Sequence, residues 1–413
     1  MNKIRGFLDS LFELSIRFCG EEVTEKIQEI LRRAEQFELD LVLKTQKYDQ
    51  NSLLSSEFIR TQFYSDTILS FCKNNLLKKD LYYNYLYEFG STCLDFGEIS
   101  LAEFAYTEII KEIENEKKYQ LLLANSLLKR AEVYIRSTRW KNANTDINKA
   151  KKIFALKNDK KGLARLFNLQ GIIKSEKGQI NAALKNFETA LNVFTKVKDN
   201  LWVGLLEMNI GNLITIQGNW DDAYVHYKRA LAAFEKLMEL KYICLVRYNL
   251  GMLFKNRGEL EAALTEFDRA LELAIEAGYL LSKGLAYLGK SDVYAKLEDY
   301  ALALEFSFKA MEVFYKIMDK VGLADTYKIK GIIQRDTSNY EIAETYLLTS
   351  LRLSEEIESI LNYAEAAYEL GILYRKWGKK DFAVKYLRIS EKYFAQVGAK
   401  ENLERVQLIM DKT

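Results

Sequence analysis

Apolar residues recur at helical spacing along most of this 413-residue chain, and one arrangement of small and large positions repeats every 40 residues. Between residues 169 and 271 it occurs three times: a glycine, a second glycine seven residues later, then alternating small and large residues. The three copies are Gly171, Gly178, Ala183, Phe187 and Ala190; Gly211, Gly218, Ala223, Tyr227 and Ala230; and Gly251, Gly258, Ala263, Phe267 and Ala270. A repeat of this length is typical of a solenoid.

The first glycine of each copy lies inside an apolar helical stretch, as Gly251 does within 248–254. Glycine in a helix interior costs about 1 kcal/mol relative to alanine, so we expect it to permit the close approach of a neighbouring helix. The second glycine is placed to end that helix in the left-handed conformation. The small and large positions then line a second helix, so each copy predicts a helix pair that packs against the next pair.

This helix pair resembles the tetratricopeptide repeat (TPR), whose first helix carries a Leu-Gly-x-x-Tyr core and whose second helix carries spaced Ala, Phe and Ala. The period is similar to that of the long-repeat branch, which includes kinesin light chain, the Pins/LGN scaffolds, MalT-type regulators and Rap- and PlcR-like peptide receptors. The resemblance covers about four-fifths of the chain. It implies an all-α fold, a right-handed α-solenoid of about eight repeats. One departure is that the proline that usually closes the second helix is missing, since the chain has no proline.

Three parts are expected along the chain. Residues 1–80 are helical in pattern, with a break at 50–52, but lie outside the repeat register, which predicts an N-terminal helical bundle or cap. Residues 398–413 predict a C-terminal capping helix. Residues 81–397 hold eight repeats, whose small position in the first helix is Gly90, Ala131, Gly171, Gly211, Gly251, Ser291, Gly331 and Gly371.

Composition narrows the class of protein. The 60 basic and 58 acidic residues nearly balance, so no overall field favours nucleic acid or a membrane surface. We find no apolar run of 18 residues and no signal peptide. The four cysteines form no CxxC pair, which indicates reduced thiols. These features predict a soluble, cytoplasmic protein.

The chemistry of the chain argues against catalysis. His226 is the only histidine, which excludes a histidine-based triad or a site with several histidine ligands, and we expect it to pack. Residues 284–291 match the phosphate-binding spacing GxxxxGK[ST], but no strand precedes them and they lie in the first helix of the sixth repeat. We interpret that match as coincidence, with nucleotide binding as a remaining hypothesis. We expect no enzyme activity, metal or cofactor.

The resemblance implies that the first helix of each pair lines a concave face and that the residue two before its small position points inward. Asn209 and Asn249 occupy that position, and Asn212 follows closely. They match the asparagine ladder with which the long-repeat branch holds the backbone of an extended peptide. An amide suits this role because it both donates and accepts hydrogen bonds. The alternative is that these asparagines occur by chance or for solubility.

A second inward feature is positive charge, carried by Lys255, Lys296, Arg335 and Arg375 near the ends of four first helices. This stripe predicts binding of acidic side chains or of a C-terminal carboxylate. The alternative is an ordinary solvated face, because acidic residues lie nearby. We therefore expect an interaction scaffold or adaptor that binds a peptide or protein segment in the concave groove. The other hypothesis is a Rap-like sensor whose N-terminal bundle responds to a peptide.

Overall fold

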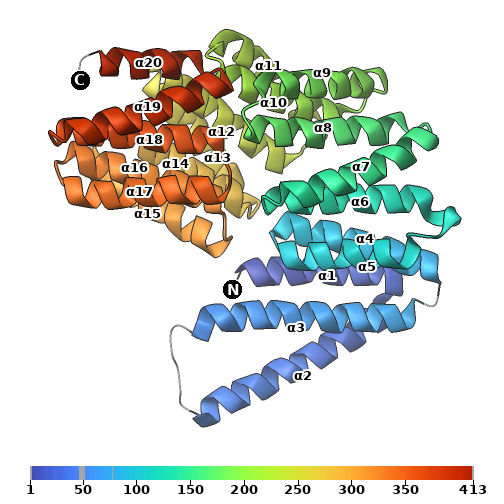
Figure 1. The fold of residues 1–413 in the computed structure, drawn as a ribbon. Helices are drawn as coiled ribbons and strands as arrows, with labels where there is room; N and C mark the ends of the chain where they lie inside the picture. The colour runs from blue at the N-terminus through green and yellow to red at the C-terminus, as the bar shows by residue number, and fades with distance from the viewer. Residues whose placement is uncertain (1, 46–51, 77, 412–413) are drawn as a thin grey trace. The chain divides into compact units, whose positions relative to one another are not determined.

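The structure is a computed structural model that describes residues 2–45, 52–76 and 78–411. Within these ranges every regular element is a helix and no strand is present, so the all-α prediction is confirmed. The break predicted at 50–52 falls mostly outside the described residues, and the next helix begins at Ser52. The chain divides into two compact units, Met1–Asp159 and Lys160–Thr413, which are treated separately below (Figure 1).

The first unit holds three helices outside the repeat register and then two helix pairs. Leu11, Ile27 and Ile68 come from the first three helices in turn and are fully buried, and these helices contact one another. A short 3-10 helix, Lys117–Tyr119, precedes the second pair. The helices are α1 (Asn2–Cys19), α2 (Glu21–Thr45), α3 (Ser52–Asn75), α4 (Lys79–Phe96), α5 (Ile99–Ile113), α6 (Gln120–Arg136) and α7 (Trp140–Leu156).

The second unit holds six helix pairs and a closing helix. Its helices are α8 (Lys160–Glu176), α9 (Ile180–Lys196), α10 (Asn200–Ile216), α11 (Trp220–Leu237), α12 (Leu240–Arg257), α13 (Leu260–Glu276), α14 (Leu280–Lys296), α15 (Tyr300–Lys316), α16 (Lys320–Asp336), α17 (Tyr340–Glu356), α18 (Ile360–Lys376), α19 (Lys380–Val397) and α20 (Lys400–Met410). Together with the pairs of the first unit, this confirms the predicted array of about eight repeats.

The turns between these helices share one backbone device. From residue 138 to residue 398, a residue in the left-handed conformation recurs every 20 positions. The prediction that Gly178 ends a helix in this way is confirmed by its φ of 69°, but Lys198 adopts the same conformation at φ 55°. There the Asp199 amide donates to the Phe194 carbonyl at 3.0 Å, the six-residue bond of a Schellman motif. Second helices therefore end without proline, although a non-glycine residue in this conformation costs about 1 kcal/mol.

Glycine is needed inside the first helices because a large side chain from the second helix lies against it, a leucine at Gly331 and Gly371 and an aromatic ring at Gly171, Gly211 and Gly251. Phe267 on α13 is fully buried. A Cβ atom added at Gly251 on α12 would lie 2.5 Å from its Cε1 atom, and one added at Gly289 on α14 would lie equally close. The ring thus packs between the first helix of its own pair and that of the next. This confirms the expected close approach and explains how one pair stacks on another.

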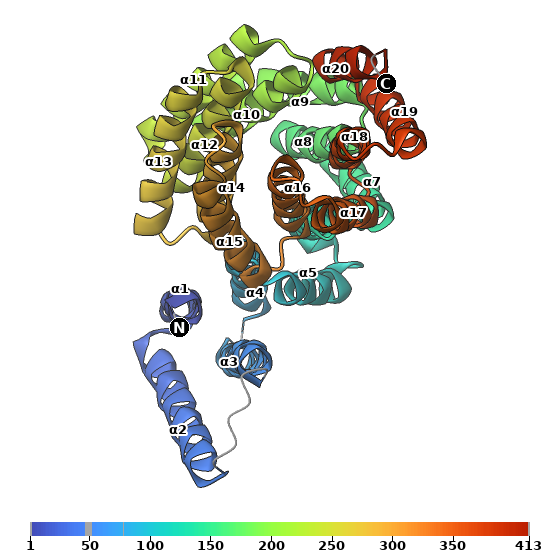
Figure 2. The same ribbon diagram turned by 90° about the vertical axis from the view of Figure 1, so that its left-hand side faces the viewer.

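The second unit curves and closes on itself. Successive first helices contact each other directly, as α12 does α14 and α14 does α16, whereas successive second helices make no comparable contact. The first helices α8, α10, α12, α14, α16 and α18 therefore lie around the inside of the curve (Figure 2). One apolar core joins Ile180 and Phe194 of the first pair to Val397 and Val406 of the last two helices. Val406 of α20 is fully buried there.

Candidate functional site

The inner face is defined here as the surface on which one first helix contacts the next in the second unit. Six of the predicted site residues lie on first helices with partners or neighbours on this face: Asn209, Asn212, Asn249, Lys255, Lys296 and Arg335. Arg375 lies near the end of α18, is exposed, and has no ion pair or hydrogen bond with the described residues. It does not join the polar contacts made by the others.

The asparagines form amide-to-amide hydrogen bonds between neighbouring first helices. Asn209 of α10 donates from Nδ2 to Oδ1 of Asn168 on α8 at 3.0 Å. Asn249 of α12 donates in the same way to Asn212 of α10 at 2.9 Å, and Tyr227 donates its hydroxyl to the same oxygen. Sequence reasoning missed Asn168, because it lies three positions before its glycine instead of two. The result is a row of amides across α8, α10 and α12.

Two of the predicted cations lie together on α12 and α14. Lys255 is buried and its Nζ lies 2.5 Å from Oδ2 of Asp292. Burial by itself would raise the pKa of Asp292, but the charge of Lys255 holds it below the usual value. Lys296 makes no ion pair with the described residues, and its pKa is lowered, first by desolvation and then by the charge of Lys255. Of the two ammonium groups, Lys296 is therefore the one that lacks an anion.

Arg335 of α16 is buried and shared between two carboxylates. It contacts Glu369 of α18, and its Nε lies 2.9 Å from Oδ1 of Asp336. Lys376 reaches the same oxygen at 2.7 Å. Burial disfavours the charged guanidinium, yet these carboxylates raise the pKa of Arg335 above its usual value. A polar hollow of about 490 Å³ opens at this point, and it is lined by Ala295, Lys296, Glu298, Tyr300, Arg335, Asp336 and Lys376.

A third ionic cluster was not anticipated from the sequence. Lys328 of α16 lies 2.9 Å from Oδ1 of Asp325 and also contacts Glu365 of α18. Asn362 of α18 donates to Asp325 at 3.3 Å. Burial raises the pKa of Asp325, while the charges of Asp325 and Glu365 overcome burial and raise the pKa of Lys328. The only signal in the sequence was the position of these residues on first helices, which does not reveal the pairing.

The two other candidates for chemistry have structural roles. Residues 284–291 lie within α14, where Ser291 is fully buried and donates its hydroxyl to the Ala303 carbonyl at 2.7 Å. Lys290 of the same stretch lies 2.5 Å from Asp268. Because this segment is a continuous helix, it does not form the phosphate-binding loop that its spacing matched. His226 of α11 packs against Glu207 of α10, with Nδ1 and Oε2 2.5 Å apart.

The described part of the chain lacks two other kinds of feature. Among the residues that the structure describes, no three His, Cys, Asp or Glu side chains are grouped so as to hold a metal ion. No described helix is both long and apolar enough to cross a bilayer. The polar groups found on the inner face are amides and ion pairs.

Comparison with known proteins agrees with this architecture. A tetratricopeptide-repeat family profile matches residues 202–274. No curated protein sequence matches the chain.

Solved structures give the wider likeness. A Rap protein complexed with competence and sporulation factor is 15% identical, with a TM-score of 0.64 over 85% of this chain and 96% of that one. The Rap conjugation gene regulator of plasmid pLS20, in complex with the Phr* peptide, is 16% identical, with a TM-score of 0.58 over 86% and 94%. NprR in complex with its cognate peptide NprX is 18% identical, with a TM-score of 0.51 over 70% and 83%. At these identities the likeness is one of fold. Residues 202–274 thus match the tetratricopeptide-repeat family, and the chain has the fold of the Rap and NprR structures.

Proposed function

We propose that this protein binds an extended peptide or protein segment along the inner face of its second unit, as an interaction scaffold or adaptor with no catalysis of its own. The observation that carries the proposal is the row of amides formed by Asn168, Asn209, Asn212 and Asn249. Each bond within the row uses one amide hydrogen and one oxygen, so donors and acceptors remain for a peptide backbone. Two structures that share this fold, the Rap conjugation gene regulator of plasmid pLS20 and NprR, were determined in complex with peptides.

The charges on the inner face indicate where an acidic side chain or the C-terminal carboxylate of such a ligand would bind. Lys296 has no anionic partner among the described residues, and it lines the polar hollow beside Arg335 and Lys376. An acidic side chain or a C-terminal carboxylate placed there gains a charge-assisted hydrogen bond without first breaking an ion pair. Lys255 and Arg335 already have carboxylate partners, so we assign them to the wall of the hollow and Lys296 to the primary contact.

The experiment is affinity capture of ligands from an extract of the source cells. The test variant carries Asn209→Ala and Asn249→Ala, and the matched control carries Asn181→Ala, an exposed amide on the second helix α9. Two lost amide contacts weaken binding by about 2 kcal/mol, or roughly 30-fold. We expect a ligand that the control retains and the test variant loses, with unchanged circular dichroism. Identical capture by the unaltered protein, the test variant and the control variant would refute binding on the inner face.

A ligand-responsive sensor is the second candidate, and the division of the chain favours it. The two compact units separate at Asp159 and Lys160, inside the repeat array instead of at the end of the N-terminal bundle. A ligand with different affinities for two arrangements of the units would shift the population between them. Small-angle X-ray scattering of the full chain, with and without the captured ligand, tests this. A change in radius of gyration supports a sensor, and an unchanged radius supports a rigid scaffold.

A further inference from the structure

The second unit has a seam, defined here as the contact of α8–α10 with α18–α20, where the end of the curve meets its beginning. At the seam the turn after α8 lies directly against the end of α19. A Cβ atom added at Gly178 would lie 2.6 Å from Cγ1 of Val397. Gly218, after α10, lies near Glu401 of α20. The contact is close enough that a side chain larger than hydrogen at Gly178 would push the two ends apart.

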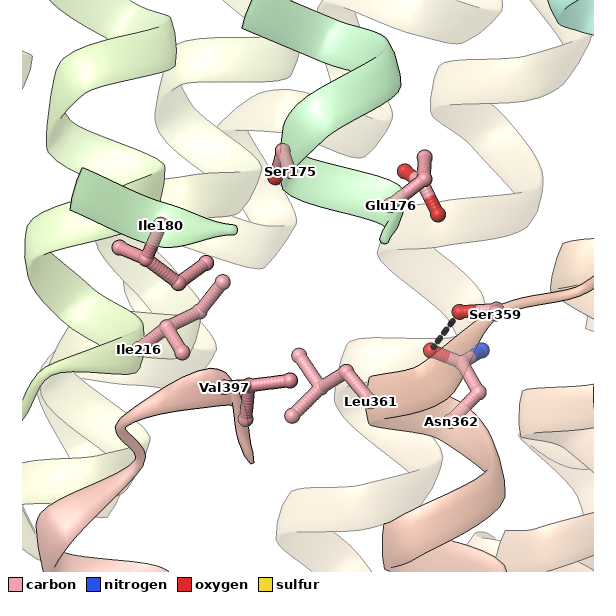
Figure 3. A pocket seen from close by; sticks show the side chains of 8 residues that line it. All are labelled: Ser175, Glu176, Ile180, Ile216, Ser359, Leu361, Asn362 and Val397. Carbon is pink, nitrogen blue, oxygen red and sulfur yellow. Dashed lines mark hydrogen bonds between the residues drawn. The ribbon is translucent and has the colours of Figure 1, made fainter. Parts of the chain in front are cut away.

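A cavity of about 90 Å³ lies within the seam (Figure 3). This volume is several times what one water molecule needs, so the cavity can hold a small polar group. Its apolar wall is formed by Ile180, Ile216, Leu361 and Val397. Its polar wall is formed by Ser175 and Glu176 of α8 on one side and by Ser359 and Asn362 of the last pair on the other.

Glu176 is the charged residue of this cavity, and it lacks a partner. Its carboxylate makes no hydrogen bond or ion pair with any residue that the structure describes, and desolvation raises its pKa. The polar groups opposite are engaged elsewhere: Ser359 donates to Asn362 at 3.3 Å, and Asn362 donates to Asp325. Glu176 is half-buried, and taking a carboxylate even partly out of water without a compensating partner is unfavourable, so a ligand that supplies one would be stabilising here.

The neighbouring ionic cluster does not supply a partner for Glu176. Asn362 connects the cavity to the cluster in which Asp325 and Glu365 share Lys328 as their cation. Glu176 has no part in that cluster, so Lys328 does not neutralise its charge. A cation with N–H donors would both neutralise this carboxylate and donate hydrogen bonds to its oxygens.

We propose that the seam cavity binds a single nitrogen cation, a primary ammonium or a guanidinium group, on the carboxylate of Glu176. If the protein binds a peptide as proposed above, that cation is the N-terminus of the peptide or one of its Lys or Arg side chains, and the inference then rests on that function. A free amine would use the same chemistry. Because α8 and the last pair both line the cavity, the bound group bridges the two ends of the second unit and holds the seam closed.

The test uses methylammonium chloride as the probe and the full chain as the protein. Hydrogen–deuterium exchange is followed in segments 172–182 and 395–403 while methylammonium is titrated against sodium chloride at constant ionic strength. We expect saturable slowing of exchange in both segments, because the occupant bridges them. Glu176→Gln should weaken the apparent affinity at least tenfold, and the matched control Glu188→Gln, on an exposed face of α9, should not change it. A response that does not saturate, or that Glu176→Gln retains, overturns the proposal.

Two further arms identify the source of the cation. Glycinamide carries the ammonium of a peptide N-terminus, and Nα-acetyl-lysinamide carries that of a lysine side chain, so whichever slows exchange at lower concentration names the source. Asn209→Ala with Asn249→Ala should leave methylammonium protection intact, since those amides lie outside the cavity. If no ligand is captured but methylammonium still slows exchange, peptide binding on the inner face is refuted and the seam site stands. If a ligand is captured but methylammonium does not slow exchange, the seam site is refuted and peptide binding stands.

Discussion

Arg335 is a predicted ligand-binding residue, but its buried ion pairs predict that it also stabilises the fold. The variant Arg335→Met tests whether it has this structural role. The substitution leaves Glu369 without an ion-pair partner among the described residues, while Asp336 keeps Lys376 at 2.7 Å. The side chains of Arg335 and Glu369 are only 9% and 18% exposed. Removing one partner of a buried pair costs about 3–5 kcal/mol. We expect a loss of about 3 kcal/mol, near the lower limit, because water still reaches part of Glu369.

The companion variant Arg335→Met with Glu369→Met removes both charges of the same pair. Replacing a buried ion pair with apolar groups is often neutral or stabilising, so this variant should recover most of the stability lost in Arg335→Met. Urea unfolding of the full chain, followed by circular dichroism, gives the free energies. Hydrogen exchange in α16 and α18 locates the loss, because a repeat array is stabilised mainly by contacts between neighbours.

The control is Arg352→Met on α17, where the arginine is exposed and the expected change is within about 0.5 kcal/mol. A loss in Arg335→Met no larger than that of the control would show that the ion pair is not structural. The same conclusion would follow if the double variant were no more stable than Arg335→Met. Either result would return Arg335 to the set of direct ligand contacts.

Two further predictions concern single charged side chains, half-buried Glu176 and buried Lys330. Burial raises the pKa of the Glu176 carboxyl, so the folded chain holds the carboxyl proton more tightly than the unfolded chain does. The protonated carboxyl therefore contributes stability at low pH. That contribution is lost as pH rises from about 4.3, the pKa in the unfolded chain, through the pKa in the folded chain. Glu176→Gln should flatten that part of the unfolding free energy against pH and stabilise the chain at pH 7; an unchanged profile contradicts the assignment. Lys330 is buried with its ammonium 3.9 Å from the centre of the Phe308 ring, and burial lowers its pKa. One repeat earlier, Lys290 and Asp268 occupy the positions of Lys330 and Phe308, and they form an ion pair. Phe308→Asp should therefore give Lys330 an anionic partner, raise its pKa and slow its acetylation at pH 8, as measured by mass spectrometry. An equal or faster acetylation rate would contradict this prediction.

The candidate site shows where sequence reasoning succeeds. Asn209 and Asn249 were placed on one face because the 40-residue period puts equivalent residues at equivalent positions on successive helices. Their hydrogen-bond partners were harder to find. Asn168 lies one position away from the register of Asn209, yet the offset between α8 and α10 brings the two amides within 3.0 Å. Registers within a helix can be read from spacing, whereas the offset between helices depends on how their side chains pack.

The predicted basic stripe shows the limit more clearly. The sequence indicates that Lys255 and Arg335 lie near the ends of their first helices, and it also shows acidic residues nearby. It does not show that Asp292 and Glu369 neutralise them, since each pair joins different helices. Side-chain length and the angle between successive first helices decide which charge meets which. Lys296 emerges as the cation without an anionic partner only once those contacts are known.

By itself, the sequence determined the helices, their pairing and the positions of their turns, because these depend on contacts between residues close along the chain. The mid-helix glycines and the large residues opposite them are local in this sense, as Gly251 and Phe267 show. Only the tertiary structure decided the curvature of the second unit, its closure at Gly178 and Val397, and the cavity beside Glu176. The physical reason is that each pair adds a small rotation, and the sum of these rotations determines whether the two ends meet.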